Sequence, residues 1–128
     1  MQVLSSRVLV RPADLEKSTA FYRDVLGLAI YRTFPGGTVF FLGQGFLEVS
    51  GSSDGGPAGP LELWMQVRDV EVAVKELAAR GVSPDREPRL EPWGLWEAWI
   101  SDPDGVRIVL VEIPADHPLR TDVRALGN

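Results

Sequence analysis

The sequence predicts an α+β fold of two paired β-α-β-β-β modules, and three observations support this prediction. Residues 7–14 and 62–69 are similar passages, each a strand-like apolar stretch that ends in an aspartate followed by helical periodicity. Three further strand patterns follow each of the two predicted helices. A segment of small residues, GSSDGGPAGP, lies between the copies at residues 51–60. Such internal repetition indicates a duplicated supersecondary unit joined by a flexible linker.

The first module is expected to span about residues 5–50. Residues 5–11 alternate between an apolar face and a face with two arginines, which is the period-two pattern of a strand. Asp14 is a good N-cap for a helix whose apolar stripe runs to Gly27. Three more strands are then predicted, the last two as a hairpin: residues 28–32, 38–42 and 46–50.

The second module is expected to span about residues 61–113 in the same order. A strand at 61–67 precedes a helix that Asp69 caps and Gly81 ends. Residues 101–105, SDPDG, contain the proline and glycine of a tight turn before the last strand. Three strands are predicted in this half, near residues 87–92, 95–100 and 106–112. The tail, residues 114–128, is polar and patternless, and its candidates for docking on a neighbouring surface are Leu119, Val123 and Leu126.

The composition fits a single domain of 128 residues with a net charge of -5 and a pI near 4.8. Lys and Arg are scattered singly, so neither nucleic acid nor an anionic membrane is expected as a partner. The absence of cysteine excludes disulfides, thiolate metal sites and cysteine nucleophiles. No signal-peptide pattern and no apolar run of membrane-spanning length occurs, which makes the cytoplasm the expected location.

This order of elements resembles the vicinal oxygen chelate superfamily, which includes glyoxalase I, extradiol dioxygenases and bleomycin-resistance proteins. Residues 14–28, DLEKSTAFYRDVLGL, are similar to the first helix of that family, and residues 102–105, DPDG, to its closing turn. The resemblance covers about residues 5–113. It implies that the sheets of the two modules curl around a central cavity, that the protein binds a small molecule there, and that it forms a homodimer.

In metal-dependent members of the family each module supplies ligands from its first and last strands. Carried over position by position, these ligands fall on Arg7 and Glu48 in the first module and on Glu62 and Val109 in the second. Arginine stays protonated and offers only hydrogen-bond donors, so it cannot ligate a cation. Two carboxylates without a histidine are also a poor transition-metal site. We therefore expect no cofactor and no divalent metal at these positions.

The charged positions allow two further interpretations. Arg7 could form a buried ion pair with Glu48 or Glu62 that fixes how the modules pair, because buried charges are normally paired. Alternatively, Arg7 could anchor a substrate carboxylate through two parallel hydrogen bonds. In that case one of the two glutamates, with a pKa raised by the other and by desolvation, could act as a general base.

Trp64 is the best aromatic candidate for a ligand pocket, because strand alternation places it on the same face as Glu62. Trp96 and Trp99 are expected to take part in core or dimer packing, and Trp93 lies beside their strand. His117, the single histidine, lies outside both modules, where a surface or tail-docking role is favoured over catalysis.

The leading hypothesis is a metal-independent protein that binds a small aromatic or anionic molecule, with four ligand-binding candidates: Arg7, Glu48, Glu62 and Trp64. The alternative is an enzyme of the glyoxalase or extradiol dioxygenase type, in which Glu48 and Glu62 serve as metal ligands or bases. A third hypothesis is a structural or partner-binding module with an internally satisfied Arg7.

Overall fold

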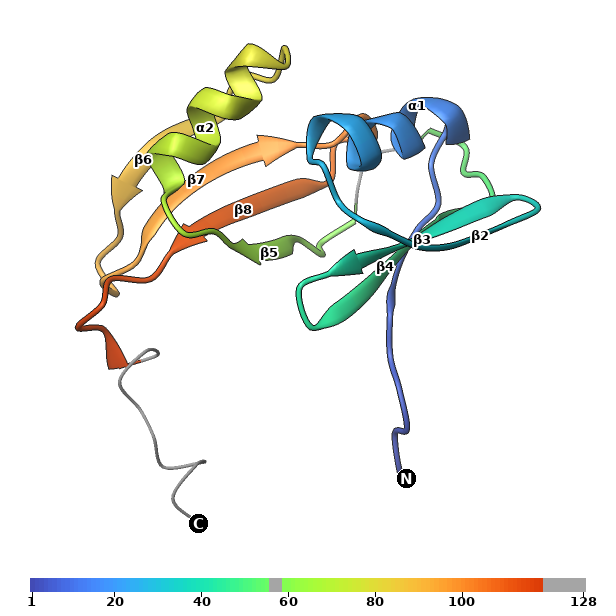
Figure 1. Cartoon of the computed structure of the whole chain (residues 1–128), viewed down its shortest axis with the longest axis horizontal. Coiled ribbons are helices and arrows are strands. Elements are labelled where there is room, and N and C mark those ends of the chain that lie inside the picture. Colours follow the sequence, from blue (N-terminus) through green and yellow to red (C-terminus); the bar gives the residue numbers. More distant parts are fainter. Residues whose placement is uncertain (56–58, 119–128) are drawn as a thin grey trace. The chain divides into compact units, whose positions relative to one another are not determined.

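The computed structural model describes residues 1–55 and 59–118 and contains two four-stranded mixed sheets (Figure 1). The strand orders are β1-β4-β3-β2 and β5-β8-β7-β6. In each sheet the first strand runs parallel to the last, and the other pairs are antiparallel. The strands of the first sheet are β1 (Val8–Val10), β2 (Ile30–Phe34), β3 (Gly37–Leu42) and β4 (Gly45–Ser50). Those of the second are β5 (Leu63–Gln66), β6 (Arg86–Leu90), β7 (Trp96–Ser101) and β8 (Arg107–Glu112). The predicted pair of β-α-β-β-β modules is confirmed.

The described residues form two compact units. The first comprises residues 1–61 together with 102–106, and the second comprises residues 62–101 together with the chain from Arg107 onward. The closing turn between β7 and β8 thus belongs to the first unit, although the strands that it joins belong to the second. The tail residues singled out for docking, Leu119, Val123 and Leu126, lie outside the described residues.

The helix of the first unit begins where the sequence predicts. The Asp14 carboxylate accepts a hydrogen bond from the Lys17 N–H at 3.1 Å, which caps α1 (Leu15–Ala20). The helix then widens into a π-helical turn, η1 (Phe21–Val25), with the Leu26 N–H bonded to the Phe21 carbonyl at 2.9 Å. Nothing in the apolar periodicity distinguishes this turn from ordinary α-helix, and the sequence analysis did not predict it.

The helix of the second unit, α2 (Val70–Ala79), is fixed at its first residue from two sides. Asp69 accepts hydrogen bonds from two first-turn amides at 3.1 Å each. From the sheet, a carboxylate oxygen of Glu112 accepts the Val70 N–H at 2.9 Å. Since Glu112 lies on β8, this bond also identifies the face of the second sheet on which α2 packs (Figure 1). The C-terminal stop predicted at Gly81 is confirmed, with φ of 87° two residues beyond the last helical residue.

Each sheet therefore has a face that carries its helix and an opposite face, which we call the helix-free face. In the first sheet, Phe40 faces the helix, because its ring lies 6.3 Å from that of the fully buried Tyr22. Side chains alternate across a strand, so Phe41 and Glu48 belong to the helix-free face. In the second sheet the same alternation places Trp64 and Arg107 on the helix-free face, opposite the side of Glu112.

The closing turn packs under the first helix through two aspartates. Asp102 is buried and accepts the hydroxyl proton of Tyr22 at 2.7 Å. Asp104 accepts hydrogen bonds from the Ala13 N–H at 2.8 Å and from the Ser18 hydroxyl at 2.9 Å. Burial raises the pKa of the Tyr22 phenol, and the hydrogen bond to Asp102 raises it further. The phenol therefore stays protonated and donates to Asp102. The segment predicted as a simple turn is thus also the anchor of the first helix.

No helix in the described part of the chain is long and apolar enough to cross a membrane. The predicted first strand is longer than the observed one, because pairing with β4 extends only over Val8–Val10. Arg7 and Arg11 therefore flank the paired segment, and both side chains reach back to β4.

Candidate functional site

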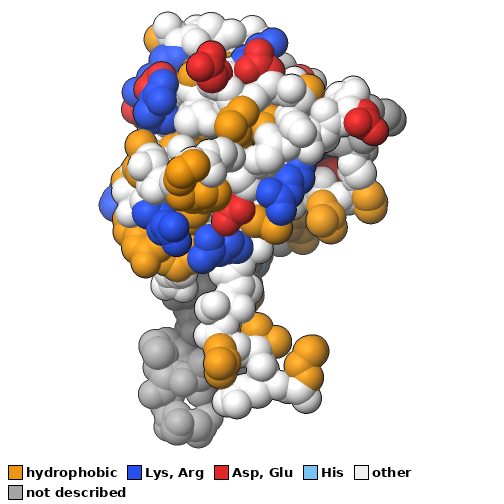
Figure 2. Space-filling model, turned by 90° about the vertical axis from the view of Figure 1, so that its right-hand side faces the viewer, with side chains coloured by type: hydrophobic (Ala, Val, Ile, Leu, Met, Phe, Trp, Pro, Cys, Tyr) orange, Lys and Arg blue, Asp and Glu red, His pale blue; other side chains and the backbone are white. Residues whose placement is uncertain are grey.

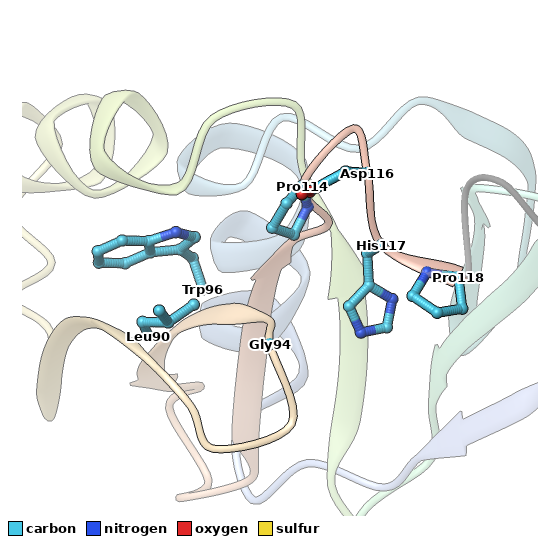
Figure 3. A pocket seen from close by; sticks show the side chains of 7 residues that line it. All are labelled: Leu90, Gly94, Trp96, Pro114, Asp116, His117 and Pro118. Atoms are coloured by element: carbon cyan, nitrogen blue, oxygen red, sulfur yellow. The ribbon is translucent and has the colours of Figure 1, made fainter.

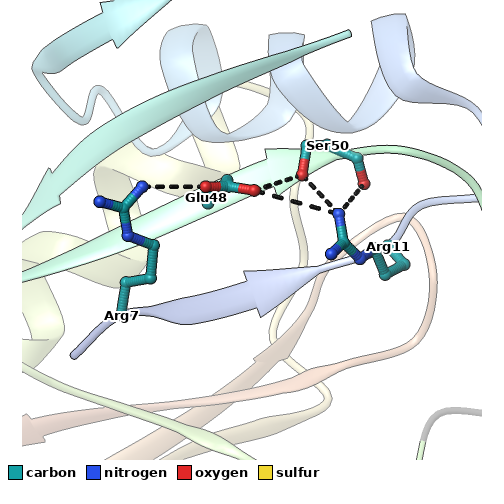
Figure 4. Close-up of polar contacts among 4 residues, drawn as sticks. All are labelled: Arg7, Arg11, Glu48 and Ser50. Atoms are coloured by element: carbon teal, nitrogen blue, oxygen red, sulfur yellow. Dashed lines mark hydrogen bonds and ion pairs between the residues drawn. The ribbon is translucent and has the colours of Figure 1, made fainter.

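The helix-free face of the first sheet carries a connected group of four polar side chains (Figure 4). Arg7 donates a hydrogen bond to one carboxylate oxygen of Glu48 at 2.9 Å, and the Ser50 hydroxyl donates to the other at 2.7 Å. Arg11 donates to the Ser50 hydroxyl at 2.7 Å and lies 4.0 Å from Glu48. The Glu48 carboxylate is therefore held from both sides by arginines.

The parallel pairing of β1 with β4 explains this arrangement. Leu9 lies opposite Glu48, so the residues two positions before and after Leu9 share its face and flank the carboxylate. Of the two partners that the sequence analysis allowed for Arg7, the structure selects Glu48. This ion pair joins two strands of one sheet.

The surroundings of the Glu48 carboxyl favour its charged form. The hydrogen bond from Ser50, followed by those of Arg7 and the charge of Arg11, holds its pKa below the ordinary value of 4.5, although partial burial opposes this. A general base at neutral pH needs a pKa shifted upward. The expected upward shift is therefore not found at Glu48, which suits this carboxylate to holding guanidinium groups.

Glu48 should make the stability of the first unit depend on acid. Its pKa is lower in the folded than in the unfolded chain, so its contribution is complete above the ordinary carboxyl pKa and is lost as pH falls through the folded value. Urea unfolding between about pH 7 and pH 3 should show the wild type losing stability faster than Glu48→Gln. Parallel pH profiles for the two proteins would contradict this assignment.

Beside the charged group lies a cluster of three aromatic rings, which the sequence analysis did not identify. The rings of Tyr31 and Phe46 are 4.8 Å apart, those of Tyr31 and Phe41 5.2 Å, and those of Phe41 and Phe46 5.6 Å. Tyr31 and Phe41 are exposed, and Phe46 is partly buried. Hydrophobic side chains lie directly beside Lys and Arg side chains on the face shown in Figure 2. The available sequence signal was that Phe46 is two residues from Glu48 on one strand.

The second sheet carries a different charged arrangement on its helix-free face. Glu62 precedes β5 and accepts a hydrogen bond from Arg107 of β8 at 3.4 Å. The Arg107 guanidinium also lies over the Trp99 ring, with its central carbon 4.1 Å from the ring centroid. Arg86 covers the other face of Trp99 at 4.0 Å. Trp64 is exposed and lies opposite Val109. Sequence reasoning found Glu62 and Trp64 but missed both arginines.

Two buried carboxylates support this arrangement from the side of β6. Glu91 forms ion pairs with Arg86 and, at 3.3 Å, with Arg89. Burial works against ionisation of Glu91, but the two arginines outweigh it and hold its pKa below the usual range. Glu97 accepts the indole N–H of Trp93 at 2.7 Å. The ion pair with Glu91 holds the side chain of Arg86 against the Trp99 ring.

The registers of the two sheets match position by position. Leu9 opposes Glu48 in the first sheet, and Trp64 opposes Val109 in the second. The four positions implied by the family resemblance therefore offer a guanidinium, an aliphatic side chain and two carboxylates, each carboxylate bonded to an arginine. This donor set does not fit a divalent transition metal. No group of three or more His, Cys, Asp and Glu residues is placed to hold a metal ion in the described ranges.

A cavity of about 380 Å³ lies at the end of the second sheet (Figure 3). It is lined by Leu90, Gly94, Trp96, Pro114 and residues 116–118. His117 approaches the Trp93 carbonyl with its Nε2 at 2.9 Å, in agreement with the favoured tail-docking role. Gly94 has φ of 88°, and a Cβ there would come within 3.1 Å of the His117 ring, so glycine permits this docking.

Comparison with protein families identifies the class. Residues 5–110 match the model of the Glyoxalase/Bleomycin resistance protein/Dioxygenase superfamily. This match covers most of the chain, which therefore belongs to that superfamily. A comparison with curated proteins found no match.

Solved structures of the same superfamily share the fold. TnmS3, an antibiotic binding protein from Streptomyces sp. CB03234, is 26% identical with a TM-score of 0.74, over 88% of this chain and 98% of that one. A bleomycin resistance determinant encoded on the transposon Tn5 is 21% identical with a TM-score of 0.71, over 87% and 98%. A lactoylglutathione lyase from Agrobacterium tumefaciens is 20% identical with a TM-score of 0.69, over 88% and 94%. Because the last two proteins are only 21% and 20% identical to this chain, their similarity supports a shared fold and nothing more.

Proposed function

We propose that this chain binds a small aromatic or anionic molecule, without a metal ion, on the helix-free faces of its sheets. The observation that carries the proposal is the aromatic cluster of Tyr31, Phe41 and Phe46 beside the Arg7–Glu48 pair. Aromatic surfaces with a few oriented polar groups are typical of small-molecule sites. Trp64 and Glu62 supply the same combination on the second sheet.

The energetics favour a planar ligand on the aromatic cluster. Tyr31 and Phe41 keep large ring surfaces in water, and covering them would stabilise a complex by about 25 cal/mol per Å² of apolar area. Aromatic pairs add about 0.5–1.5 kcal/mol beyond area burial. Arg7 has five N–H donors and gives one hydrogen bond to Glu48, so its remaining donors can orient an anionic substituent.

Two further considerations support binding over metal chemistry. TnmS3, similar over nearly its whole length, is described as an antibiotic binding protein. In addition, a cation at the family's ligand positions would stand beside the guanidinium of Arg7, which repels it. The homodimer implied by the family resemblance and the cytoplasmic location expected from the sequence stay predictions, and size determination in solution tests the first of them.

A ligand screen on metal-stripped protein tests the proposal. A panel of planar aromatic compounds and antibiotics should contain at least one that raises the melting temperature equally with and without EDTA. Phe41→Ala should weaken binding of that compound about three- to tenfold, because it removes one of the two exposed rings of the cluster. Val72→Ala is the matched control, since Val72 is an exposed apolar residue on α2 of the other unit.

Two results would overturn this function. One is stoichiometric Ni, Zn, Mn or Fe in purified protein that Glu48→Gln abolishes. The other is turnover of a glyoxalase- or dioxygenase-type substrate that depends on Glu48 or Glu62. The first result would overturn metal-independent binding, and the second would establish the enzymatic alternative.

A further inference from the structure

The helix-free face of the second sheet presents a guanidinium in a fixed orientation. Arg107 lies over Trp99 at 4.1 Å, and the opposite face of the indole is covered by Arg86 at 4.0 Å. A guanidinium over an indole ring is attracted to the negative face of the ring, so Trp99 holds the Arg107 head group in place. The side chain nevertheless keeps 43% of its surface exposed. Arg107 thus combines an oriented donor edge with access to solvent.

The Trp99 ring beneath Arg107 is supported by Arg86, which is only 17% exposed and is paired with a carboxylate. Arg86 forms an ion pair with the buried Glu91 and donates to the Glu97 carbonyl at 3.2 Å. Trp99 also packs against the apolar cluster that contains Val109. A ligand that meets Arg107 therefore encounters a group whose orientation is already fixed, which reduces the entropy lost on binding.

The ion pairs of Arg7 and Arg107 differ in how easily a ligand can replace them. Arg7 meets Glu48 at 2.9 Å, and that carboxylate is only 16% exposed and holds a second hydrogen bond from Ser50. Arg107 meets Glu62 at 3.4 Å, and Glu62 is 48% exposed. Ion pairs with such exposure contribute little to stability, so an incoming anion can take the place of Glu62.

We propose that Arg107 is the anchor for the carboxylate of a planar aromatic anion whose ring lies along Trp64. Trp64 opposes Val109, and Arg107 is two residues before Val109 on the same face, so the two side chains are diagonal neighbours. The carboxylate replaces Glu62 on the donor edge of the guanidinium and forms charge-assisted hydrogen bonds. This inference rests on the proposed function and narrows its ligand to an aromatic anion held on the second sheet.

The effect of removing the Glu62 charge distinguishes this role of Glu62 from catalysis and from metal binding. If Glu62 competes with the ligand for Arg107, its removal strengthens binding of an anion. If Glu62 were a general base or a metal ligand, its removal would instead impair function. Glu62→Gln keeps the shape of the side chain and removes the charge, so it separates these roles.

Calorimetric titration of the full chain with naphthoate and with its neutral amide tests the inference. Naphthoate should bind more tightly than the amide, and its affinity should fall with added salt. Arg107→Gln should weaken naphthoate about tenfold or more and leave the amide nearly unchanged. Arg107→Lys should recover only part of the loss, because lysine keeps the charge without the planar donor edge. Glu62→Gln should tighten naphthoate about two- to fivefold.

Arg32→Gln is the matched control, since Arg32 also lies over an aromatic ring, that of Phe34, on the first sheet. It should leave naphthoate affinity unchanged, and circular dichroism confirms the fold of each variant. The inference is overturned if a folded Arg107→Gln binds naphthoate like the wild type, if Glu62→Gln weakens it, or if the wild type binds no naphthoate at millimolar concentration. Binding that instead depends on Arg7 would overturn it while leaving the proposed function in place.

Discussion

Replacing Asp102 with alanine should lower the free energy of unfolding by about 3–5 kcal/mol. Asp102 is buried and accepts three hydrogen bonds: from the Tyr22 hydroxyl at 2.7 Å and from the amides of Asp104 at 2.8 Å and Val106 at 2.9 Å. The alanine variant leaves the phenol of the fully buried Tyr22 without its acceptor. An unsatisfied buried donor costs about 1–3 kcal/mol, and the closing turn loses its internal bonds as well.

Two companion variants identify the source of that loss. Tyr22→Phe keeps the turn intact and removes only the phenol, so it should cost about 1–2 kcal/mol. Asp54→Ala removes an exposed aspartate of the same unit and should be close to neutral. Urea unfolding of the three proteins measures these differences. If Asp102→Ala were no more destabilising than Asp54→Ala, the turn would not anchor the first helix.

The duplicated fold could be predicted because its signals are local. Asp14 and Asp69 each cap a helix, and both capping contacts are present at 3.1 Å. The strands could be read from alternation over short stretches, since each alternates between its helix-bearing and helix-free faces. Boundary errors of one to three residues occur at β1 and β2, where pairing with a neighbouring strand decides where a strand ends.

The aromatic cluster could not be predicted, because it depends on an irregular pairing between β2 and β3. The register between β2 and β3 shifts between Ile30 and Arg32, where Ile30 opposes Phe40 and Arg32 opposes Val39. Such an irregularity adds a residue to one strand, and it changes which face the neighbouring side chains occupy. Simple alternation along β2 therefore gives no indication that Tyr31 meets Phe41.

The charged residues were found in part, because strand alternation locates a residue on a face but does not identify its partner. Arg7, Glu48, Glu62 and Trp64 were chosen as positions, and the structure joins Arg7 with Glu48. Glu62 instead pairs with Arg107. The first sheet has its arginine just before the first strand and its glutamate on the last, whereas the second sheet has its glutamate just before the first strand and its arginine on the last. Duplication preserved the backbone register while the charges diverged, and the sites are expected to have diverged with them.

Replacing Gly37 with alanine should destabilise the protein by about 2–4 kcal/mol and also disturb the charged group on the first sheet. A Cβ at Gly37 would lie 2.5 Å from the Ser50 Cβ and 2.6 Å from the Phe34 ring. The Ser50 Cβ is attached to a paired strand, so it can move only with the backbone of β4. That movement displaces the hydroxyl that binds Glu48 at 2.7 Å and should loosen the hold of Glu48 on Arg7.

Gly45→Ala provides a control of opposite sign within the same sheet. Gly45 begins β4 as Gly37 begins β3, but its added Cβ would meet only the Leu42 carbonyl, at an ordinary 3.7 Å. Replacing glycine by alanine in a strand without a clash reduces the entropy of the unfolded chain, so this variant should be neutral or more stable by up to about 1 kcal/mol. Urea unfolding and carboxyl NMR of Glu48 should therefore separate the two variants. Equal effects of the two substitutions would mean that the close approach of β3 to Ser50 does not require glycine at position 37. They would also mean that this close approach does not keep the Ser50 hydroxyl beside Glu48.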